Sequence, residues 1–125
     1  TTSNIIMAFT KVKSEVLGDE FFTRASLTTI SAATTHVVDF TAASVVPITA
    51  SAAVTLNFTN HKPGMVKNVI ITDSGGTSSL AYDGSDTVKV LNGEYSATAG
   101  AVNFIQVVCV NTNTFYITIS QEPTA

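Results

Sequence analysis

From residue 25 onward, apolar and polar residues alternate in short segments, and a period of two indicates β-strands rather than helices. The clearest segments are "AVTLNFTN" (residues 53–60), "MVKNVIITD" (residues 65–73) and "TFYITISQ" (residues 114–121). Because alternate side chains of a strand point to opposite faces, the apolar positions of these segments should line one core. The predicted core residues are Val54, Leu56, Phe58, Val69, Ile71, Ile117 and Ile119.

Turn-forming residues separate the strand segments at regular intervals. "DG" at residues 83–84 and "NG" at residues 92–93 are hairpin signals, because both turn positions accept a positive φ. "PG" at residues 63–64 and "NTN" at residues 111–113 predict further tight turns, and Pro47 demotes its strand to a sheet edge or a bulge. About eight or nine short strands follow, with no amphipathic helix between them. This pattern predicts an all-β fold, an antiparallel β-sandwich or jelly roll.

The first part of the chain differs, and it predicts an N-terminal arm (residues 1–24) ahead of a jelly-roll β-sandwich domain (residues 25–125). In the arm, Phe9, Val12 and Val16 have roughly helical spacing, but Gly18 interrupts it early, so we expect one helical turn or a short strand. The arm either packs on a neighbouring subunit or frays as a loose terminus. In the first case the contact residues would be Phe9, Val12, Phe21 and Phe22.

Composition favours a protein that is held in an assembly. Only 12% of the 125 residues are charged, against about 25% in typical globular chains, and Thr, Ser and Asn largely take their place. A surface with few charged residues opposes association with other chains less than a highly charged surface does. The net charge of -3 and six basic residues exclude an electrostatic footprint for nucleic acid. The chain contains no run of 18 apolar residues, which a transmembrane helix would need, so we expect no membrane partner.

Residues that could carry catalysis or hold a metal are few. The single Cys109 lies in an apolar run, which predicts a small buried hydrophobe and leaves no intrachain disulfide. Nothing in the sequence places His36 or His61 beside a carboxylate or Cys109. Asp83 and Asp86 lack the further oxygen ligands of a calcium loop, and we interpret their segment as a turn. We therefore expect no catalytic residue, no metal and no cofactor.

A carbohydrate site is the remaining possibility for ligand binding. Sugar rings often stack on exposed aromatic side chains, and the chain has no Trp. Its tyrosines are Tyr82, Tyr95 and Tyr116, and a surface tyrosine with Asn and Asp neighbours could contact a glycan. The competing interpretation is a half-buried tyrosine at a sheet edge or subunit contact.

Taken as a unit, residues 35–121 resemble a β-rich domain of tailed-phage virion proteins, found in tail fibres, head fibres and capsid decoration proteins. The resemblance depends on "TLNFTN" (residues 55–60), "AGAVNFIQVV" (residues 99–108) and the aromatic last strand "TFYITISQ" (residues 114–121). Many relatives carry a Trp-Pro-Gly-rich segment before the closing strands. This chain instead has "YDGSDTVKVLNGEYSA" (residues 82–97), which favours a scaffold or decoration role over receptor binding.

The resemblance implies a non-enzymatic virion structural protein, either a capsid decoration or a head-fibre protein. Its partners would be the major capsid protein or another virion protein, and such relatives are often trimers that present jelly rolls outward. The alternative is a tail-fibre module that recognises a host surface glycan. A polysaccharide hydrolase is a third possibility. It would need two carboxylates about 5 to 10 Å apart in a cleft, and only Asp83 and Asp86 are close in sequence.

Overall fold

The computed structural model describes residues 23–123, and this part of the chain is all-β, with nine strands and no helix. The predicted number of strands is therefore confirmed. A six-stranded sheet has the order β1-β3-β5-β8-β9-β7, and a three-stranded sheet has the order β2-β4-β6. The strands are β1 (Thr28–Ile30), β2 (Thr34–Asp39), β3 (Val45–Ala50), β4 (Ala53–Thr59), β5 (Val66–Asp73), β6 (Ser79–Tyr82), β7 (Thr87–Asn92), β8 (Val102–Asn111) and β9 (Thr114–Gln121).

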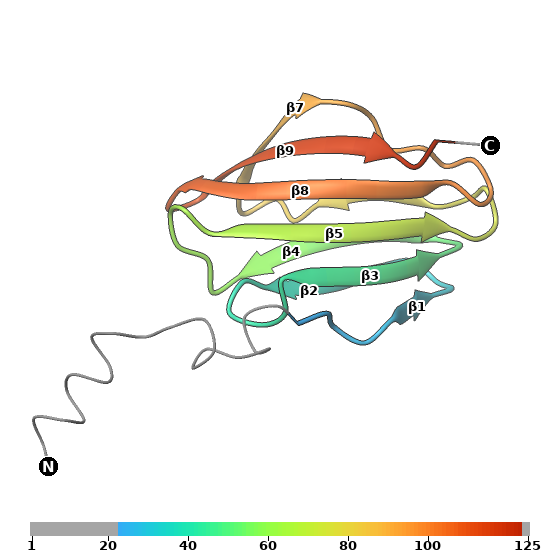
Figure 1. The fold of residues 1–125 in the computed structure, drawn as a ribbon, viewed down its shortest axis with the longest axis horizontal. Coiled ribbons are helices and arrows are strands. Elements are labelled where there is room, and N and C mark those ends of the chain that lie inside the picture. The colour runs from blue at the N-terminus through green and yellow to red at the C-terminus, as the bar shows by residue number, and fades with distance from the viewer. Residues whose placement is uncertain (1–22, 124–125) are drawn as a thin grey trace, which may run out of the picture.

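The first six strands pass alternately between the two sheets, and each passage adds a parallel strand beside the previous one (Figure 1). Thr28 of β1 pairs with Ile48 of β3, and Thr34 of β2 pairs with Val54 of β4. The two members of each pair are therefore separated by the same number of residues in both sheets. One strand on each sheet forms what we call a rung: β1 with β2, β3 with β4, and β5 with β6. The three rungs form a coil of the β-solenoid type.

The remaining strands close the larger sheet. β8 pairs antiparallel with β5 and with β9, and β7 lies parallel to β9 at the sheet edge. Asn111 and Thr114 pair across the β8–β9 turn, which confirms the turn predicted at residues 111–113. The coil therefore ends in a hairpin, and the hairpin contains the longest strand of the molecule, β8 (Figure 1).

The expectation of an antiparallel sandwich or jelly roll was wrong in its pairing, because five of the seven strand pairs are parallel. Alternation specifies that a strand is half-buried but does not specify the direction of its neighbour. The two hairpin signals also failed. Residues 83–84 lead from β6 to β7 in the other sheet, and residues 92–93 follow a strand whose partner is β9.

Pro47 lies in β3, which is an interior strand rather than the expected edge. The pairing of β3 with the chain before it is irregular near this point. Arg24 bridges to Val45, whereas Thr28 pairs with Ile48, so the register shifts between these two pairs. A proline has no N–H to donate to a neighbouring strand, and this break in pairing is compatible with it. Pro47 itself pairs in register with Ile70 of β5, so β3 has no bulge at this residue.

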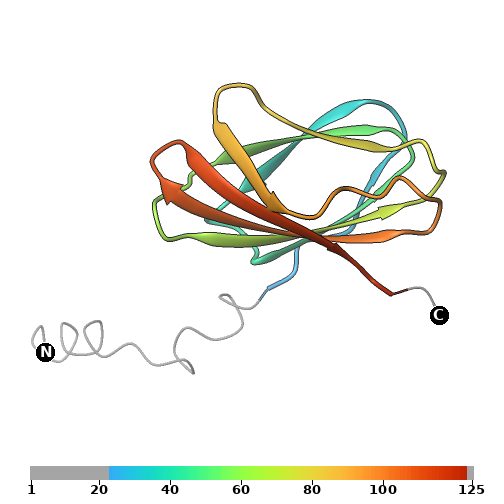
Figure 2. The ribbon, with the colours of Figure 1, turned by 90° about the horizontal axis from the view of Figure 1, so that it is seen from above.

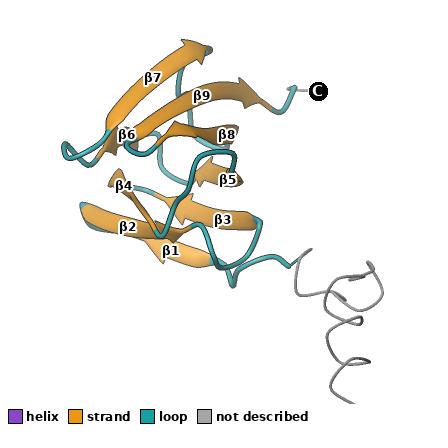
Figure 3. Cartoon of the chain, turned by 90° about the vertical axis from the view of Figure 1, so that its left-hand side faces the viewer, coloured by secondary structure: helices purple, strands orange, loops and turns teal. Residues whose placement is uncertain are grey.

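The core lies between the two sheets, which face each other as two layers (Figures 2 and 3). All seven predicted core residues are buried. At one end of the core, the Phe58 and Phe115 rings lie 4.7 Å apart between centroids, and Phe40 contacts both. Each such ring stabilises the fold by roughly 1.5–3 kcal/mol through burial. The predicted arm contacts Phe9, Val12, Phe21 and Phe22 lie outside the described residues.

Candidate docking surface

The outer face of the six-stranded sheet carries exposed apolar side chains, and no described residues form a layer over it (Figure 2). Val66 of β5 pairs with Val108 of β8, and Val108 pairs with Tyr116 of β9. Pairing across a sheet places these three side chains in one row on one face. Phe104 and Val110 lie on the same strand as Val108 at alternate positions, so they extend the patch along β8. We call these five residues the outer apolar patch.

A shallow groove of about 320 Å³ runs across this patch, with Leu91 of β7 on its far side. Leu91 is 59% exposed and Val66 is 49% exposed, which is unusual for side chains of this size. The polar groups that line the groove are the side chains of Gln106 and Thr118 and the hydroxyl of Tyr116, and the lining contains no carboxylate, histidine, lysine or cysteine. The groove is therefore suited to binding by apolar burial.

The structure separates the three tyrosines that were predicted as possible glycan contacts. Tyr116 lies in the outer apolar patch, whereas Tyr82 and Tyr95 line a second groove of about 390 Å³ between β6 and β7. The Tyr82 ring lies 6.4 Å from that of Phe58, and burial raises the pKa of Tyr82 to about 12. The Tyr95 hydroxyl lies 2.6 Å from Ser78 Oγ. Both tyrosines are thus partly buried against the core, and their contact with a glycan stays a prediction.

Asp73, at the end of β5, is fully buried and anchors the turn that leads to β6. Its carboxylate accepts hydrogen bonds from the Gly75 N–H at 2.9 Å, from the Gly76 N–H, and from the Ser78 N–H and hydroxyl. Burial raises the pKa of Asp73, but these hydrogen bonds outweigh it and hold the pKa below its usual value. The hydrogen-bonding capacity of the carboxylate is thus filled by donors from the turn that follows Asp73.

The structure brings His61 close to Cys109, a contact that no signal in the sequence predicted. The His61 Nδ1 atom lies 3.8 Å from the Cys109 Sγ atom, because the corner between β4 and β5 adjoins the end of β8. The thiol is fully buried and donates to the Asn111 carbonyl at 3.0 Å, and burial raises the pKa of Cys109. A nucleophilic thiol needs a lowered pKa and access. The prediction of a buried hydrophobe is confirmed.

The other titratable groups form no cluster within the described part of the chain. Asp83 accepts bonds from the Ser85 N–H at 3.0 Å and the Ser85 hydroxyl at 2.8 Å, which is a local turn. His36 is half-buried on β2, and burial lowers its pKa. Among residues 23–123, no three His, Cys, Asp or Glu side chains are placed to hold a metal ion. The same residues contain no helix that is long and apolar enough to cross a membrane.

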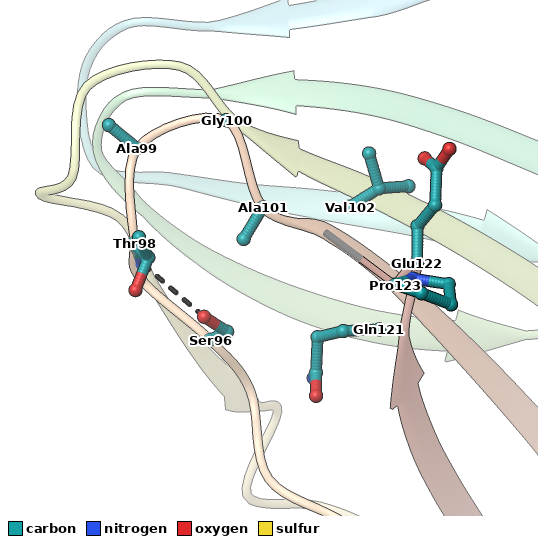
Figure 4. Close-up of a pocket in the computed structure, with 9 residues that line it drawn as sticks. All are labelled: Ser96, Thr98, Ala99, Gly100, Ala101, Val102, Gln121, Glu122 and Pro123. Carbon is teal, nitrogen blue, oxygen red and sulfur yellow. Dashed lines mark hydrogen bonds between the residues drawn. The ribbon is translucent and has the colours of Figure 1, made fainter. Parts of the chain in front are cut away.

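A third hollow, of about 730 Å³, lies beside the loop before β8 and the end of β9 (Figure 4). Two of its polar side chains, Gln121 and Ser96, are hydrogen-bonded within the fold. Gln121 donates to the Glu94 carbonyl at 2.7 Å and to Asn103 Oδ1 at 2.9 Å. Ser96 accepts from the Thr98 N–H at 3.4 Å, and Glu122 lies on the other side of the hollow (Figure 4). The residues that line this hollow include no aromatic platform for a sugar.

No protein-family model matches the chain, and searches of curated proteins and of solved structures found no match. The functional conclusion therefore depends on the surface described above and on the sequence resemblance.

Proposed function

We propose that the chain is a non-enzymatic structural protein of a virion, a capsid decoration or head-fibre protein that binds neighbouring subunits. The observation that carries the proposal is the outer apolar patch, where exposed side chains from β5, β8 and β9 gather on one uncovered sheet face. Large exposed apolar patches mark interaction sites on soluble domains. The virion location and a trimeric state come from the sequence resemblance alone.

The binding free energy expected of such a contact is suited to a protein that is held in an assembly by several contacts. Burying about 400 Å² of apolar surface contributes roughly 10 kcal/mol, whereas association costs about 4–15 kcal/mol in lost freedom. One patch alone would therefore bind weakly. Several contacts made at once, as on a trimer or a capsid lattice, would raise the overall affinity by orders of magnitude. The low charge of the chain is compatible with this permanent placement.

Electron microscopy of intact particles tests the proposal. A decoration protein should occupy the capsid at a fixed copy number and raise the melting temperature of the particle. Tyr116→Lys should lower the occupancy, because it places a charge in the docking surface. The matched control is Val37→Lys, since Val37 is 53% exposed on the outer face of the smaller sheet. Particles without the protein, or equal effects of both variants, would contradict the proposal.

A tail-fibre module that recognises a host glycan is the second candidate. The observation in its favour is that Tyr82 and Tyr95 line one groove together with Glu94. A glycan bound there should lose affinity in Glu94→Gln and be unaffected by Tyr116→Lys. Binding of the purified protein to host cells, measured by competition with infection, separates this function from decoration.

A further inference from the structure

The smaller sheet ends at β6, and among the described strands only β4 pairs with it. The Asp83 N–H donates to the Leu56 carbonyl of β4 at 2.9 Å, and Leu56 pairs with Tyr82. Along a strand, successive residues direct their backbone N–H and C=O groups to opposite sides in turn. Leu80 and Tyr82 therefore direct these groups away from β4, toward the open edge of the sheet.

The β6 edge lacks the features that protect the neighbouring edge of the larger sheet. That sheet ends at β7, which carries Lys89 and has a register shift between Val90 and Asn92. Charged side chains, lysine above all, and bulges are common means of preventing an edge strand from pairing with another chain. β6 has the sequence Ser-Leu-Ala-Tyr and pairs with β4 without a shift in register. It is therefore the less protected of the two edges.

An apolar groove of about 390 Å³ lies on the inner side of this edge. Leu80 and Tyr82 line the groove from β6, Val90 lines it from β7 and Ile119 from β9. A residue that pairs opposite Leu80 or Tyr82 would direct its side chain to the same face of the sheet as they do. Every second side chain of an added strand would therefore enter the groove, where an apolar one would cover Val90, now 44% exposed.

The surroundings of the groove carry negative charge. Glu94 is exposed in the groove lining, and Asp83 directly follows β6. The lining contains no lysine or arginine, and Lys89 points to the opposite face of β7 from Val90. A basic residue in the added strand would complement these carboxylates. A second copy of β6 would instead bring like charges together, which disfavours pairing between two copies.

We propose that the β6 edge binds an extended segment of another protein, with apolar residues at alternate positions and a lysine or arginine beside them. Hydrogen bonds to the Leu80 and Tyr82 backbone hold the segment, and the groove and Glu94 select its side chains. A glycan has hydroxyl groups but no backbone that repeats at the spacing of a strand, so this edge favours a peptide. The inference goes beyond the proposed function and does not depend on it, because the outer apolar patch lies on the outer face of the larger sheet.

An NMR titration of the protein with a synthetic peptide tests the inference. The probe is a short acetylated and amidated peptide in which valine and threonine alternate, with a lysine at each end. It is adequate because strand addition depends mainly on backbone hydrogen bonds. We expect binding with a Kd of about 1 mM or tighter, with the largest amide shifts at Leu80, Tyr82 and Glu94. Nuclear Overhauser contacts should join the peptide backbone to β6.

Two methylated peptides provide matched controls on the unchanged protein. One is N-methylated at its valines and the other at its threonines, so each loses the N–H groups on one side only. One of the two should bind at least about tenfold more weakly, while the other should keep its affinity. Loss on valine methylation indicates antiparallel addition, because residues opposite Leu80 and Tyr82 then bond to them directly. Loss on threonine methylation indicates parallel addition.

Two variants of the protein test the edge and the charge separately. Leu80→Pro removes an outward N–H without removing a bond to β4, and it should abolish binding, whereas the control Leu80→Val should keep it. Glu94→Lys should weaken binding of the lysine peptide by about twofold to fivefold and strengthen binding of a peptide that ends in glutamate. The methylated peptides keep the test independent of how well Leu80→Pro folds.

Three results would overturn the inference. The first is an absence of amide shifts at about 5 mM peptide. The second is equal binding of the two methylated peptides, or shifts centred on the outer apolar patch, since neither involves the edge of β6. The third is an oligosaccharide that shifts the Tyr82 and Tyr95 amides where the peptide does not, which would assign the groove to a glycan.

Discussion

At the scale of single residues, the fold depends on a few buried polar groups and on glycines in the turns. Asp73 is fully buried, yet its carboxylate is satisfied by four donors from the turn that follows it. Gly93 has a φ of +83°, and a Cβ atom there would clash with the Ile119 carbonyl oxygen. Both features were visible in the sequence only as turn signals, because burial and close approach depend on the tertiary structure.

Asp73 should make the stability of the protein sensitive to acid. Its pKa lies below the ordinary value of 3.8 in the folded protein, so its contribution is present above pH 3.8 and is lost as the pH falls through the folded pKa. Asp73→Asn should destabilise the fold by about 1–3 kcal/mol at neutral pH and flatten the loss below pH 4. Urea unfolding between pH 2 and pH 7 measures both effects, with Glu122→Gln, at an exposed carboxylate, as the control. Unchanged acid sensitivity would contradict this role.

Three glycine substitutions separate the cost of a clash from the cost of a backbone conformation. Gly93→Ala should destabilise by about 3 kcal/mol or more, because it combines a positive φ with the clash against Ile119. Gly64→Ala should cost about 1 kcal/mol, because Gly64 has a φ of +97° but open space around it. Gly84→Ala, with neither feature, should change the stability by less than about 0.5 kcal/mol. Thermal unfolding should give this order, and equal effects at Gly93 and Gly64 would show that the clash is relieved.

At the scale of elements, the alternation of apolar residues predicted the strands and the core correctly, but it did not predict which strands lie side by side. Val54 and Leu56 are buried as expected, because a period of two fixes the face of a strand. The parallel pairing of β2 with β4 depends on how residues 40–44 cross to the other sheet, and no local signal specifies that path. The contact between His61 and Cys109 was missed for the same reason, since it joins residues far apart in sequence.

One buried side chain holds such a crossing in place. The Lys67 ammonium donates to the carbonyls of Ala42 at 2.8 Å and Ala43 at 2.7 Å, in the corner between β2 and β3. Lys67→Met should destabilise the fold by about 1.5–3 kcal/mol, because it leaves both carbonyls without this donor. Chemical denaturation measures the loss, and Lys89→Met on the exposed part of β7 is the matched control. Equal stability of the two variants would show that water replaces the ammonium.

At the scale of the whole molecule, the two outer faces differ in character. The larger sheet presents Val66, Val110 and Tyr116, whereas the smaller sheet presents Thr and Asn side chains from β4 together with Val37 of β2. The composition predicted association in general, but the location of the surface depends on which strands are adjacent. The tyrosines show this limit, because Tyr116 lies on the proposed docking face and Tyr82 packs on the core.

A side-chain-resolution electron microscopy map of the protein in its native assembly tests the docking surface most directly. The account predicts that Val66, Val110 and Tyr116 contact another chain, while Thr55 and Thr59 on the smaller sheet face solvent. A map in which the outer apolar patch is bare, and the smaller sheet or the groove at Tyr95 makes the contacts, would contradict it.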